Sequence, residues 1–375
     1  MKKDKLGKFV KIKTGKLDAN ASSLDGIYPF FTCSKEPLKI SSYSYDCRCV
    51  LVAGNGDLNV KYYEGKFDAY QRTYIIESID ESILDIRYLY WFLSKYVEKL
   101  RELSIGGVIK YIKLNNLTDP IILLPPLKDQ KRIVKILDAA DALCHKRKQA
   151  ITLLDDYLKS VFLEMFGDLF KNEKKWKFFE FENYVTLLTD YHANGSYEVL
   201  RDNVKLFLEP NHALMVRTTD LENNNYTNDV NYIDEHAYNF LSKSKVFGGE
   251  IIINKIGSAG KIYLMPKLDR PVSLGMNAFL LRFKDGVNVN FIYYLLTSAY
   301  GKAIIQKKVK GAVTKTIRKD AVRSLLVPEI SPDLQNKFSV IFEKTESIKQ
   351  KMLIQLQELE ICFQALMQKA FKGEL

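Results

Sequence analysis

The chain has 375 residues, of which 56 are Lys or Arg and 45 are Asp or Glu, so its formal net charge is +11. At about 150 residues per domain, this length predicts two or three domains and excludes a small disulfide-stabilised module. Hydrophobic residues make up 47% of the chain and only 10 residues are Pro, which excludes a disordered tail or a fibrous repeat. The start lacks the apolar stretch of a signal peptide, and no apolar run approaches the roughly 18 residues that span a bilayer. We therefore expect a cytoplasmic protein whose five cysteines are reduced thiols.

The first predicted elements lead up to a long helix. Residues 50–56 indicate an apolar strand that runs into a Gly turn, and residues 88–94 indicate a helix rich in aromatic side chains. Residues 127–166 contain neither Pro nor Gly and repeat apolar side chains at steps of three and four. This pattern predicts a helix of about 40 residues, roughly 60 Å long, and it favours a coiled coil over an ordinary helical bundle. The apolar stripe includes Leu137, Ile151, Leu154, Leu158 and Met165.

The second half of the chain repeats this order at an offset near 203 residues. A second helix without Pro or Gly is predicted over 333–372, with a stutter in its heptad pattern at Met352. Two copies predict a pseudo-twofold α+β protein, in which two α/β domains are separated by two long antiparallel helices that form a coiled coil. The matched segments are 50–56 with 250–257, 88–94 with 291–297, 107–110 with 311–314, and Pro125 with Pro328. The second apolar stripe includes Ile348, Met352, Leu359 and Leu366.

The excess positive charge lies outside the two predicted helices. Residues 127–168 hold 8 basic and 7 acidic side chains and residues 332–375 hold 6 of each, which leaves +10 for the remaining segments. Residues 302–323 alone carry eight basic side chains against the single acid Asp320. Such a cluster is typical of phosphate binding along a nucleic-acid backbone, and the alternative is a solvated basic face.

Motifs that would identify an enzyme or a metal site are absent from the sequence. It contains no GxxxxGK[ST] phosphate loop, no HExxH, and no paired Cys and His residues at zinc spacing. Cys47 and Cys49 have no partner pair nearby, so we expect no metal site. The Gly-rich segments 54–57 and 257–260 are not followed by a predicted helix, which favours turns within a sheet over phosphate cradles. We therefore expect no catalytic residues in this chain.

The sequence resembles the specificity subunits of type I restriction-modification systems. The resemblance is carried by Tyr28-Pro29-Phe30-Phe31, by the strand and turn at 50–56, by the run from Leu124-Pro125-Pro126-Leu127 to Gln130-Lys131-Arg132-Ile133, and by the final Ala370 to Leu375. The second Pro segment departs from the pattern, because it reads Pro328-Glu329-Ile330. The resemblance implies target-recognition domains at 1–124 and 170–330, and spacer helices at 125–169 and 331–375.

The resemblance also implies a function and a set of partners. The chain would bind double-stranded DNA at a bipartite target, each half read by one domain, with a non-specific spacer between the halves. It would direct methyltransferase subunits, two in number, and restriction or translocase subunits, with no membrane involved. Catalysis would belong to these partners, so S-adenosylmethionine, ATP and Mg are expected there and no cofactor is expected in this chain. The alternatives are a coiled-coil scaffold that binds a partner, and a self-sufficient DNA nuclease or methyltransferase.

Two groups of residues are predicted to contact DNA. Basic residues near the ends of the two recognition domains are expected to contact phosphates, and polar residues in loops after the early strands are expected to read bases. The predicted phosphate contacts are Lys110, Lys113, Lys308, Lys310, Lys315, Arg318 and Lys319. The predicted base contacts are Thr32, Ser34, Lys35, Gln71 and Arg72 in the first domain, and Arg217, Thr218, Thr219, Lys255, Ser258 and Asn277 in the second.

Overall fold

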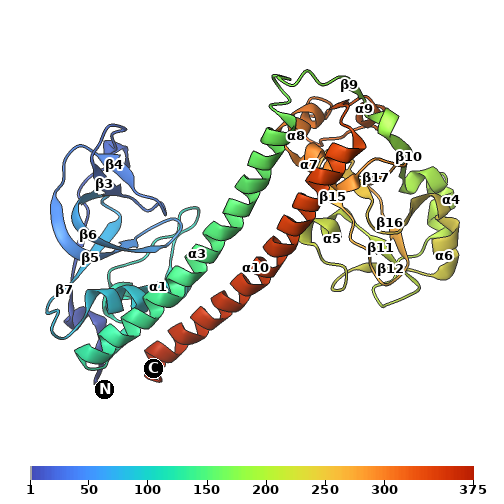
Figure 1. Cartoon of the computed structure of the whole chain (residues 1–375). Helices are drawn as coiled ribbons and strands as arrows, with labels where there is room; N and C mark the ends of the chain where they lie inside the picture. The colour runs from blue at the N-terminus through green and yellow to red at the C-terminus, as the bar shows by residue number, and fades with distance from the viewer. Residues whose placement is uncertain (1) are drawn as a thin grey trace. The chain divides into compact units, whose positions relative to one another are not determined.

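The computed structural model describes residues 2–375, which divide into two compact units (Figure 1). The first unit consists of the residues up to Ile151 together with Lys351–Leu375, and the second consists of Thr152–Gln350. Each unit therefore contains one globular fold and half of each long helix. The long helices are α3 (Leu127–Phe166) and α10 (Pro332–Lys372). Helix and strand are mixed throughout, which confirms the α+β class with two long helices.

The first unit is built on a six-stranded sheet in the order β2-β7-β5-β6-β3-β4, and β1 pairs separately with β8. Helix α1 packs against β5 and β6. The side chain of Asp85 starts this helix by accepting hydrogen bonds from the backbone N–H groups of Arg87 and Tyr88. The strands are β1 (Lys2–Lys5), β2 (Val10–Thr14), β3 (Tyr28–Phe31), β4 (Leu38–Ile40), β5 (Tyr45–Ala53), β6 (Val60–Ala69), β7 (Thr73–Ser78) and β8 (Ile121–Leu124); the helices are α1 (Ile86–Leu103) and α2 (Asn115–Thr118).

The second unit contains two four-stranded sheets, β10-β17-β14-β15 and β12-β11-β16-β13, and a two-stranded pair of β18 with β9. Its strands are β9 (Phe178–Glu180), β10 (Val185–Asp190), β11 (Ala213–Val216), β12 (Asn231–Ile233), β13 (Lys245–Val246), β14 (Ile251–Asn254), β15 (Ile262–Leu264), β16 (Val272–Leu274), β17 (Ala278–Phe283) and β18 (Leu326–Pro328). Its helices are α4 (Tyr197–Asn203), α5 (Thr218–Asn223), α6 (Glu235–Phe240), α7 (Val289–Thr297), α8 (Ala299–Gln306) and α9 (Lys319–Arg323).

A buried glutamine connects the start of each long helix to the globular fold of its unit. The Gln130 side chain donates to the carbonyl oxygens of Ile83 and Pro125 at 2.7 and 2.9 Å, and it accepts from the backbone N–H of Asp85 at 2.9 Å. Gln335 makes the equivalent bonds in the second unit, where it donates to the Ile330 carbonyl and accepts from the Asn288 N–H. Asp85 and Asn288 are the N-caps of α1 and α7. The predicted internal repeat is therefore present in the hydrogen bonding of the two units.

Two registers in the predicted repeat are wrong. The equivalent bonds of Gln130 and Gln335 match Pro125 with Ile330 instead of Pro328, and a glycine match is shifted by one residue. The alignment of 107–110 with 311–314 pairs Gly107 with Gly311, whereas the hydrogen bonds pair Gly106 with Gly311. The backbone of Ile105 bonds to Tyr111, and that of Lys310 bonds to Thr316. Gly106 and Gly311 both have a positive φ, of 118° and 106°, while Gly107 does not. Gly106 is therefore the counterpart of Gly311, because both positions need the positive φ that glycine adopts easily.

The long helices run antiparallel within each unit. In the first unit, Lys148 of α3 forms a 2.7 Å ion pair with Glu360 of α10, and Arg147 hydrogen-bonds Gln355. In the second unit, Asp155 of α3 pairs with Lys349 of α10. The stripe on α3 lies as predicted, with Leu137 and Leu158 fully buried and Ile151, Leu154 and Met165 half-buried.

The stripe on α10 differs from the prediction at Ile348. This side chain is 46% exposed, and Lys349 takes its place, with its stem toward the stripe and its ammonium on Asp155. When Lys349 is counted in place of Ile348, successive positions of the stripe are separated alternately by three and four residues. The predicted stutter at Met352 is therefore absent. Phe342, Thr345, Lys349, Met352, Leu356, Leu359, Phe363 and Leu366 are the buried and half-buried positions of this stripe.

The helix stripe predicts different costs for two alanine substitutions in the second unit. Leu158→Ala should lower the free energy of unfolding by about 2–5 kcal/mol, because it leaves a cavity at a side chain that is 2% exposed. Ile348→Ala should change it by no more than about 0.5 kcal/mol, because the side chain lies on the outer face. Urea unfolding of both variants measures the difference. An equal cost at the two positions would contradict the stripe described here.

Candidate nucleic-acid interface

The predicted base-reading loops of the first unit lie at one edge of its six-stranded sheet. The loop after β3 and the turn between β6 and β7 are joined by a hydrogen bond from the Tyr70 N–H to the Phe31 carbonyl, at 2.9 Å. The Cys33 thiol lies 3.6 Å from the Arg72 carbonyl oxygen. The turn after β5 joins them, because Asn59 donates to the Cys33 carbonyl at 2.8 Å. The structure therefore brings these three loops together.

Four of the five predicted side chains at this edge face solvent. The exposed residues are Ser34, Lys35, Gln71 and Arg72. Thr32 differs from the prediction, since it is only 6% exposed and its hydroxyl accepts a hydrogen bond from the Ser34 N–H at 3.2 Å. Its role is to shape the loop, which leaves the other four to contact a ligand. Lys35 is only loosely paired, with 3.9 Å between its ammonium and the Asp57 carboxylate.

The second unit places four predicted residues around one cavity of about 500 Å³. Arg217, Thr218, Thr219 and Asn277 line it, together with apolar side chains such as Met276. The Gly275 N–H donates to the Val216 carbonyl at 2.8 Å, which joins the loop after β16 to the start of α5. Asn277 has a φ of 70°, a left-handed conformation that Asn tolerates better than most residues. This loop geometry leaves Asn277 exposed at the mouth of the cavity.

The guanidinium of Arg217 is already occupied by an acid. It contacts the buried carboxylate of Asp220, with 2.7 Å between Nη2 and Oδ1. This hydrogen bond raises the pKa of Arg217. Arg217 therefore closes one wall of the cavity, and the exposed hydroxyl of Thr219 and the amide of Asn277 remain available to a ligand.

Two predicted lysines pair with a carboxylate inside the second unit. Lys255 and Lys319 both bind Asp190, at 3.1 and 2.8 Å, and their side chains are only 18% and 30% exposed. Burial alone would raise the pKa of Asp190, but the hydrogen bonds from Lys319 and Lys255 outweigh it, so the pKa is lowered. Lys255 and Lys319 are therefore engaged in ion pairs within the second unit, and their predicted contacts with bases and phosphate stay predictions. Both side chains support the loops instead of facing a ligand freely.

The other predicted phosphate-binding residues fall into two groups. Lys308 is half-buried and donates to the Ser324 hydroxyl at 2.9 Å, so it is partly committed to the fold. The remaining five are exposed, and their side chains form no ion pair with any of the residues 2–375. These five are Lys110, Lys113, Lys310, Lys315 and Arg318.

A second cavity of about 500 Å³ lies beside the turn between β14 and β15. Ser258 and Lys315 line it, as predicted residues, together with Lys261 and Lys302. The Gly257 N–H donates to the Lys315 carbonyl at 3.0 Å and fixes the turn against the loop that carries Lys315. Sequence reasoning placed Lys302 in the basic cluster but did not select it, and Lys261 was missed because it lies outside that cluster. Lys261 pairs with Glu222, so Lys302 and Lys315 are the two lysines of this cavity that are left to attract an anion.

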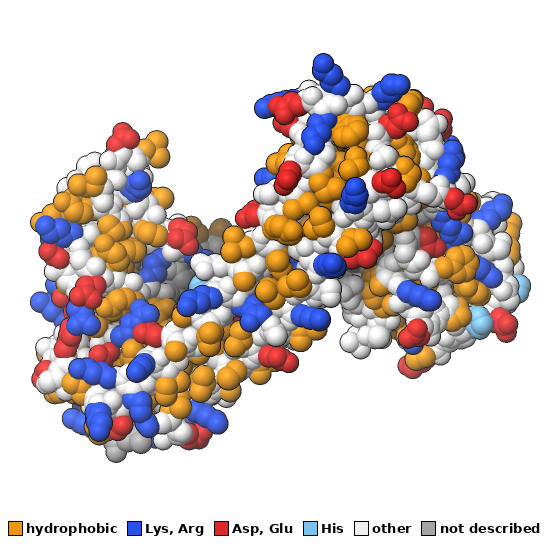
Figure 2. Space-filling view, viewed as in Figure 1, with side chains coloured by type: hydrophobic (Ala, Val, Ile, Leu, Met, Phe, Trp, Pro, Cys, Tyr) orange, Lys and Arg blue, Asp and Glu red, His pale blue; other side chains and the backbone are white. Residues whose placement is uncertain are grey.

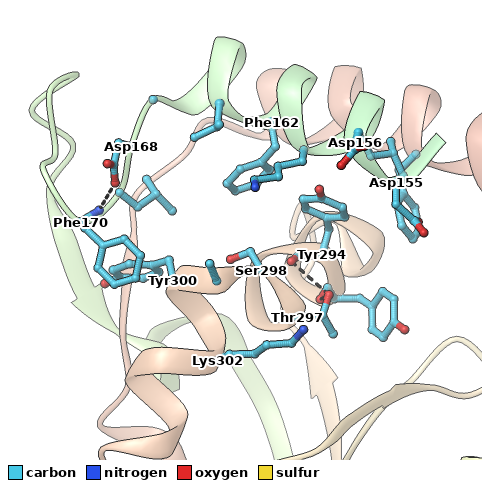
Figure 3. A pocket seen from close by; sticks show the side chains of 18 of the residues that line it. Asp155, Asp156, Phe162, Asp168, Phe170, Tyr294, Thr297, Ser298, Tyr300 and Lys302 are labelled. Atoms are coloured by element: carbon cyan, nitrogen blue, oxygen red, sulfur yellow. Dashed lines mark hydrogen bonds between the residues drawn. The ribbon is translucent and has the colours of Figure 1, made fainter. Parts of the chain in front are cut away.

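A third cavity of the second unit, of about 700 Å³, has a different character (Figure 3). Figure 3 shows Phe162 and Tyr294 at its wall, and Asp155, Asp156 and Asp168 near its rim. Burial raises the pKa of Glu346, which also lines this cavity. Its four acids and three lysines make it unsuited to a phosphate backbone, and sequence analysis gave no sign of it.

The long helices expose apolar side chains that the coiled-coil pattern leaves outside. In Figure 2 such side chains lie between charged ones along the helices. In the first unit Leu143, Ile354 and Ile361 are 54%, 59% and 64% exposed. In the second unit Leu153 and Leu163 are 65% and 46% exposed. These apolar side chains are exposed on the outer faces of both helices.

Residues 2–375 contain neither a membrane-spanning helix nor a cluster of metal ligands. No helix among them combines the length and the apolar character that crossing a bilayer requires. Within the same range, no three His, Cys, Asp or Glu side chains converge in a way that could hold a metal ion.

Comparisons with known proteins agree on one family. Residues 1–153 match the type I restriction modification DNA specificity domain. The chain is 28% identical to the type I restriction enzyme EcoDI specificity subunit of Escherichia coli, over 99% of this chain and 87% of that protein. It is 22% identical to the MjaVIII specificity subunit of Methanocaldococcus jannaschii, over 95% and 88%.

The fold is similar to that of a solved structure over nearly its whole length. The type I restriction-modification S subunit from M. genitalium superimposes with a TM-score of 0.67 at 16% identity, and covers 99% of this chain and 96% of that one. At this identity, the similarity is one of fold.

The Asp190 ion pairs predict a pH-dependent stability. Asp190→Asn should lower the free energy of unfolding by about 1–3 kcal/mol near neutral pH, because two charged hydrogen bonds are lost. The native pKa lies below the ordinary 3.8, so the unfolded chain takes up the proton first as the pH falls. The difference in free energy of unfolding between variant and parent should therefore persist at pH values above the pKa of Asp190 in the unfolded chain. It should vanish at pH values below the pKa of Asp190 in the native protein. Urea unfolding at several pH values measures it.

The matched control is Asp320→Asn, in which the replaced carboxylate is 92% exposed. This substitution should change the free energy of unfolding little at any pH. A cost for Asp190→Asn that does not change with pH would contradict the assigned ion pairs.

Proposed function

We propose that this chain is a specificity subunit of a type I restriction-modification system and that it reads a bipartite DNA target, one half with each unit. The observation that carries the proposal is the repeated arrangement of loops. In each unit, one turn is hydrogen-bonded through its backbone both to a loop with an exposed polar side chain and to a loop with an exposed lysine. The turn after β5 bonds to the carbonyls of Arg72 and Lys110, and the turn after β14 bonds to those of Asn277 and Lys315. Exposed amides can pair with base edges, while lysines neutralise phosphates. One such surface in each unit fits a target with two halves and a spacer.

The contacts divide into those that set position and those that specify sequence. The exposed cations Lys110, Lys113, Lys310, Lys315 and Arg318 would hold phosphates. Ser34, Lys35, Gln71 and Arg72 in the first unit would read bases, as would Thr219, Ser258 and Asn277 in the second. Thr32, Arg217, Lys255 and Lys319 would hold these loops in place.

Catalysis in this proposal belongs to partner subunits. The chain would recruit two methyltransferase subunits together with restriction or translocase subunits, and these would bring S-adenosylmethionine, ATP and Mg. The exposed apolar side chains of the long helices, such as Leu153 and Ile361, offer the surface for such partners. Pure chain incubated with labelled S-adenosylmethionine and target DNA should transfer no methyl group. Methyl transfer without an added methyltransferase subunit would contradict the assignment.

A domain exchange tests whether the two units read independently. Replacing residues 170–330 with the matching segment of a relative should change one half of the methylated sequence and leave the other half unchanged. The reason is that no predicted DNA contact of the first unit lies in this segment. Methylation mapping by sequencing, in cells that carry the chimera with its partner subunits, reports both halves and the spacer. A change in both halves would contradict independent reading.

The salt dependence of binding tests the phosphate contacts. Arg318→Ala should weaken DNA binding for all sequences and lower the slope of log K against log salt by about one unit. Lys344→Ala removes an exposed lysine on α10 and serves as the matched control, with an unchanged slope expected. Fluorescence anisotropy with the assembled complex at several salt concentrations measures both. An altered recognition sequence with an unchanged slope would show that Arg318 reads bases instead.

A further inference from the structure

Each unit carries a short closed loop whose tip is a fully exposed valine. The first fingertip loop is 105–111 and the second is 310–316. Each is closed by two backbone hydrogen bonds between its ends, at 3.0 and 2.8 Å in the first and at 2.9 and 2.7 Å in the second. Val108 is 102% exposed and Val313 is 98% exposed. Both valines therefore project into solvent with almost no contact to the fold.

The shape of the loops depends on one glycine in each. A Cβ on Gly106 would lie 2.5 Å from the Ile109 carbonyl oxygen, and one on Gly311 would lie 2.1 Å from that of Thr314. Both glycines also have a positive φ, so no other residue fits without rearrangement. The structure thus holds Val108 and Val313 in the same defined geometry in two separate units.

The two loops share three residues at equivalent positions. Their sequences, IGGVIKY and KGAVTKT, agree at the glycine, the valine and the following lysine, which are Gly106, Val108 and Lys110 in the first loop. An exposed valine adds nothing to the packing of either unit. Its presence at the tip of both loops is therefore explained by a bound partner rather than by folding.

The loops are attached to the candidate base-reading edges. The Gly56 N–H donates to the Lys110 carbonyl at 2.9 Å, and the Gly257 N–H donates to the Lys315 carbonyl at 3.0 Å. Gly56 and Gly257 lie in the turns after β5 and β14, the turns that carry or contact the predicted reading residues. A ligand that touches these edges therefore comes within reach of the fingertips.

The charge around the loops identifies the partner. Lys110 and Lys113 lie exposed in or beside the first loop, as do Lys310 and Lys315 in the second. None of the four pairs with an acid anywhere in the described part of the chain. A nucleic-acid groove offers apolar base surfaces between rows of phosphates, and this matches an apolar tip flanked by cations.

We propose that Val108 and Val313 enter a groove of the DNA and make apolar contact with bases, one in each half of the target, while Lys110 and Lys315 hold the adjacent phosphates. This rests on the proposed function and adds a specific part to it. Apolar side chains contact bases through thymine methyl groups or by partial insertion between base steps, and either contact is lost when the side chain is shortened. The valines therefore contribute apolar contact and the lysines contribute electrostatic attraction, and an experiment can separate the two contributions.

The test compares alanine variants in complex with the methyltransferase subunits. Val108→Ala and Val313→Ala should each weaken binding to target DNA about three- to tenfold with an unchanged salt slope, because no charge is removed. The double variant should show the product of the two factors, because the sites are independent. Lys315→Ala should lower the salt slope by about one unit. Val340→Ala, at a valine on α10 that is 50% exposed, is the matched control and should bind as the parent does.

A photocrosslinking residue at position 108 or 313 identifies the partner directly. Crosslinks to DNA support the proposal, and crosslinks to a methyltransferase subunit alone would overturn it. Parental affinity of the Val108→Ala/Val313→Ala double variant would also overturn it. Circular dichroism melting checks folding, which should not change for side chains without packing contacts. If the domain exchange still alters one half-site while the double variant binds normally, the fingertip proposal fails and the proposed function stands.

Discussion

Aromatic packing between each globular fold and its own halves of the long helices is the interaction on which the rest of the molecule depends. In the second unit, Phe162 and Phe166 of α3 meet Phe338 of α10 and Phe291 of α7, with Phe166 and Phe291 centred 5.1 Å apart. In the first unit, Phe371 at the end of α10 packs on Tyr88 of α1, at 5.2 Å. The helices are therefore part of each core rather than separate struts, and the buried glutamines fix where they start.

Outside these aromatic contacts, each fold presents exposed loops whose side chains can vary. The loops there are held by backbone hydrogen bonds, as between Gly257 and Lys315, and by internal ion pairs, as at Asp190. The exposed side chain of Gln71 can change without disturbing the core, whereas the φ of 70° at Asn277 favours residues that tolerate a left-handed conformation. This separation allows a recognition surface to change its target while the fold that presents it stays the same.

The sequence predicted the large elements well and the individual contacts poorly, for identifiable reasons. Helix α3 and its stripe follow from periodicity, which depends on local chemistry alone. The exchange of Ile348 for Lys349 on α10 could not be predicted, because it depends on Asp155, far away in the sequence. The ion pair of Lys255 could not be predicted for the same reason, because Asp190 is brought to it only by the fold. Conversely, the buried role of Gln130 was present in a recognised motif, but the motif did not reveal which atoms it bonds.

The composition of the first unit has a consequence for synthesis on the ribosome. Its core includes Met367 and Ala370, both nearly fully buried against residues from the opposite end of the chain. The second unit needs only Thr152–Gln350, a continuous segment, and can complete its core first. The unit translated first is thus the last to finish folding, and until Lys351–Leu375 emerge it exposes apolar surface that a chaperone would recognise. A frameshift in the codons for Lys351–Leu375 would therefore damage the fold formed by the residues up to Ile151.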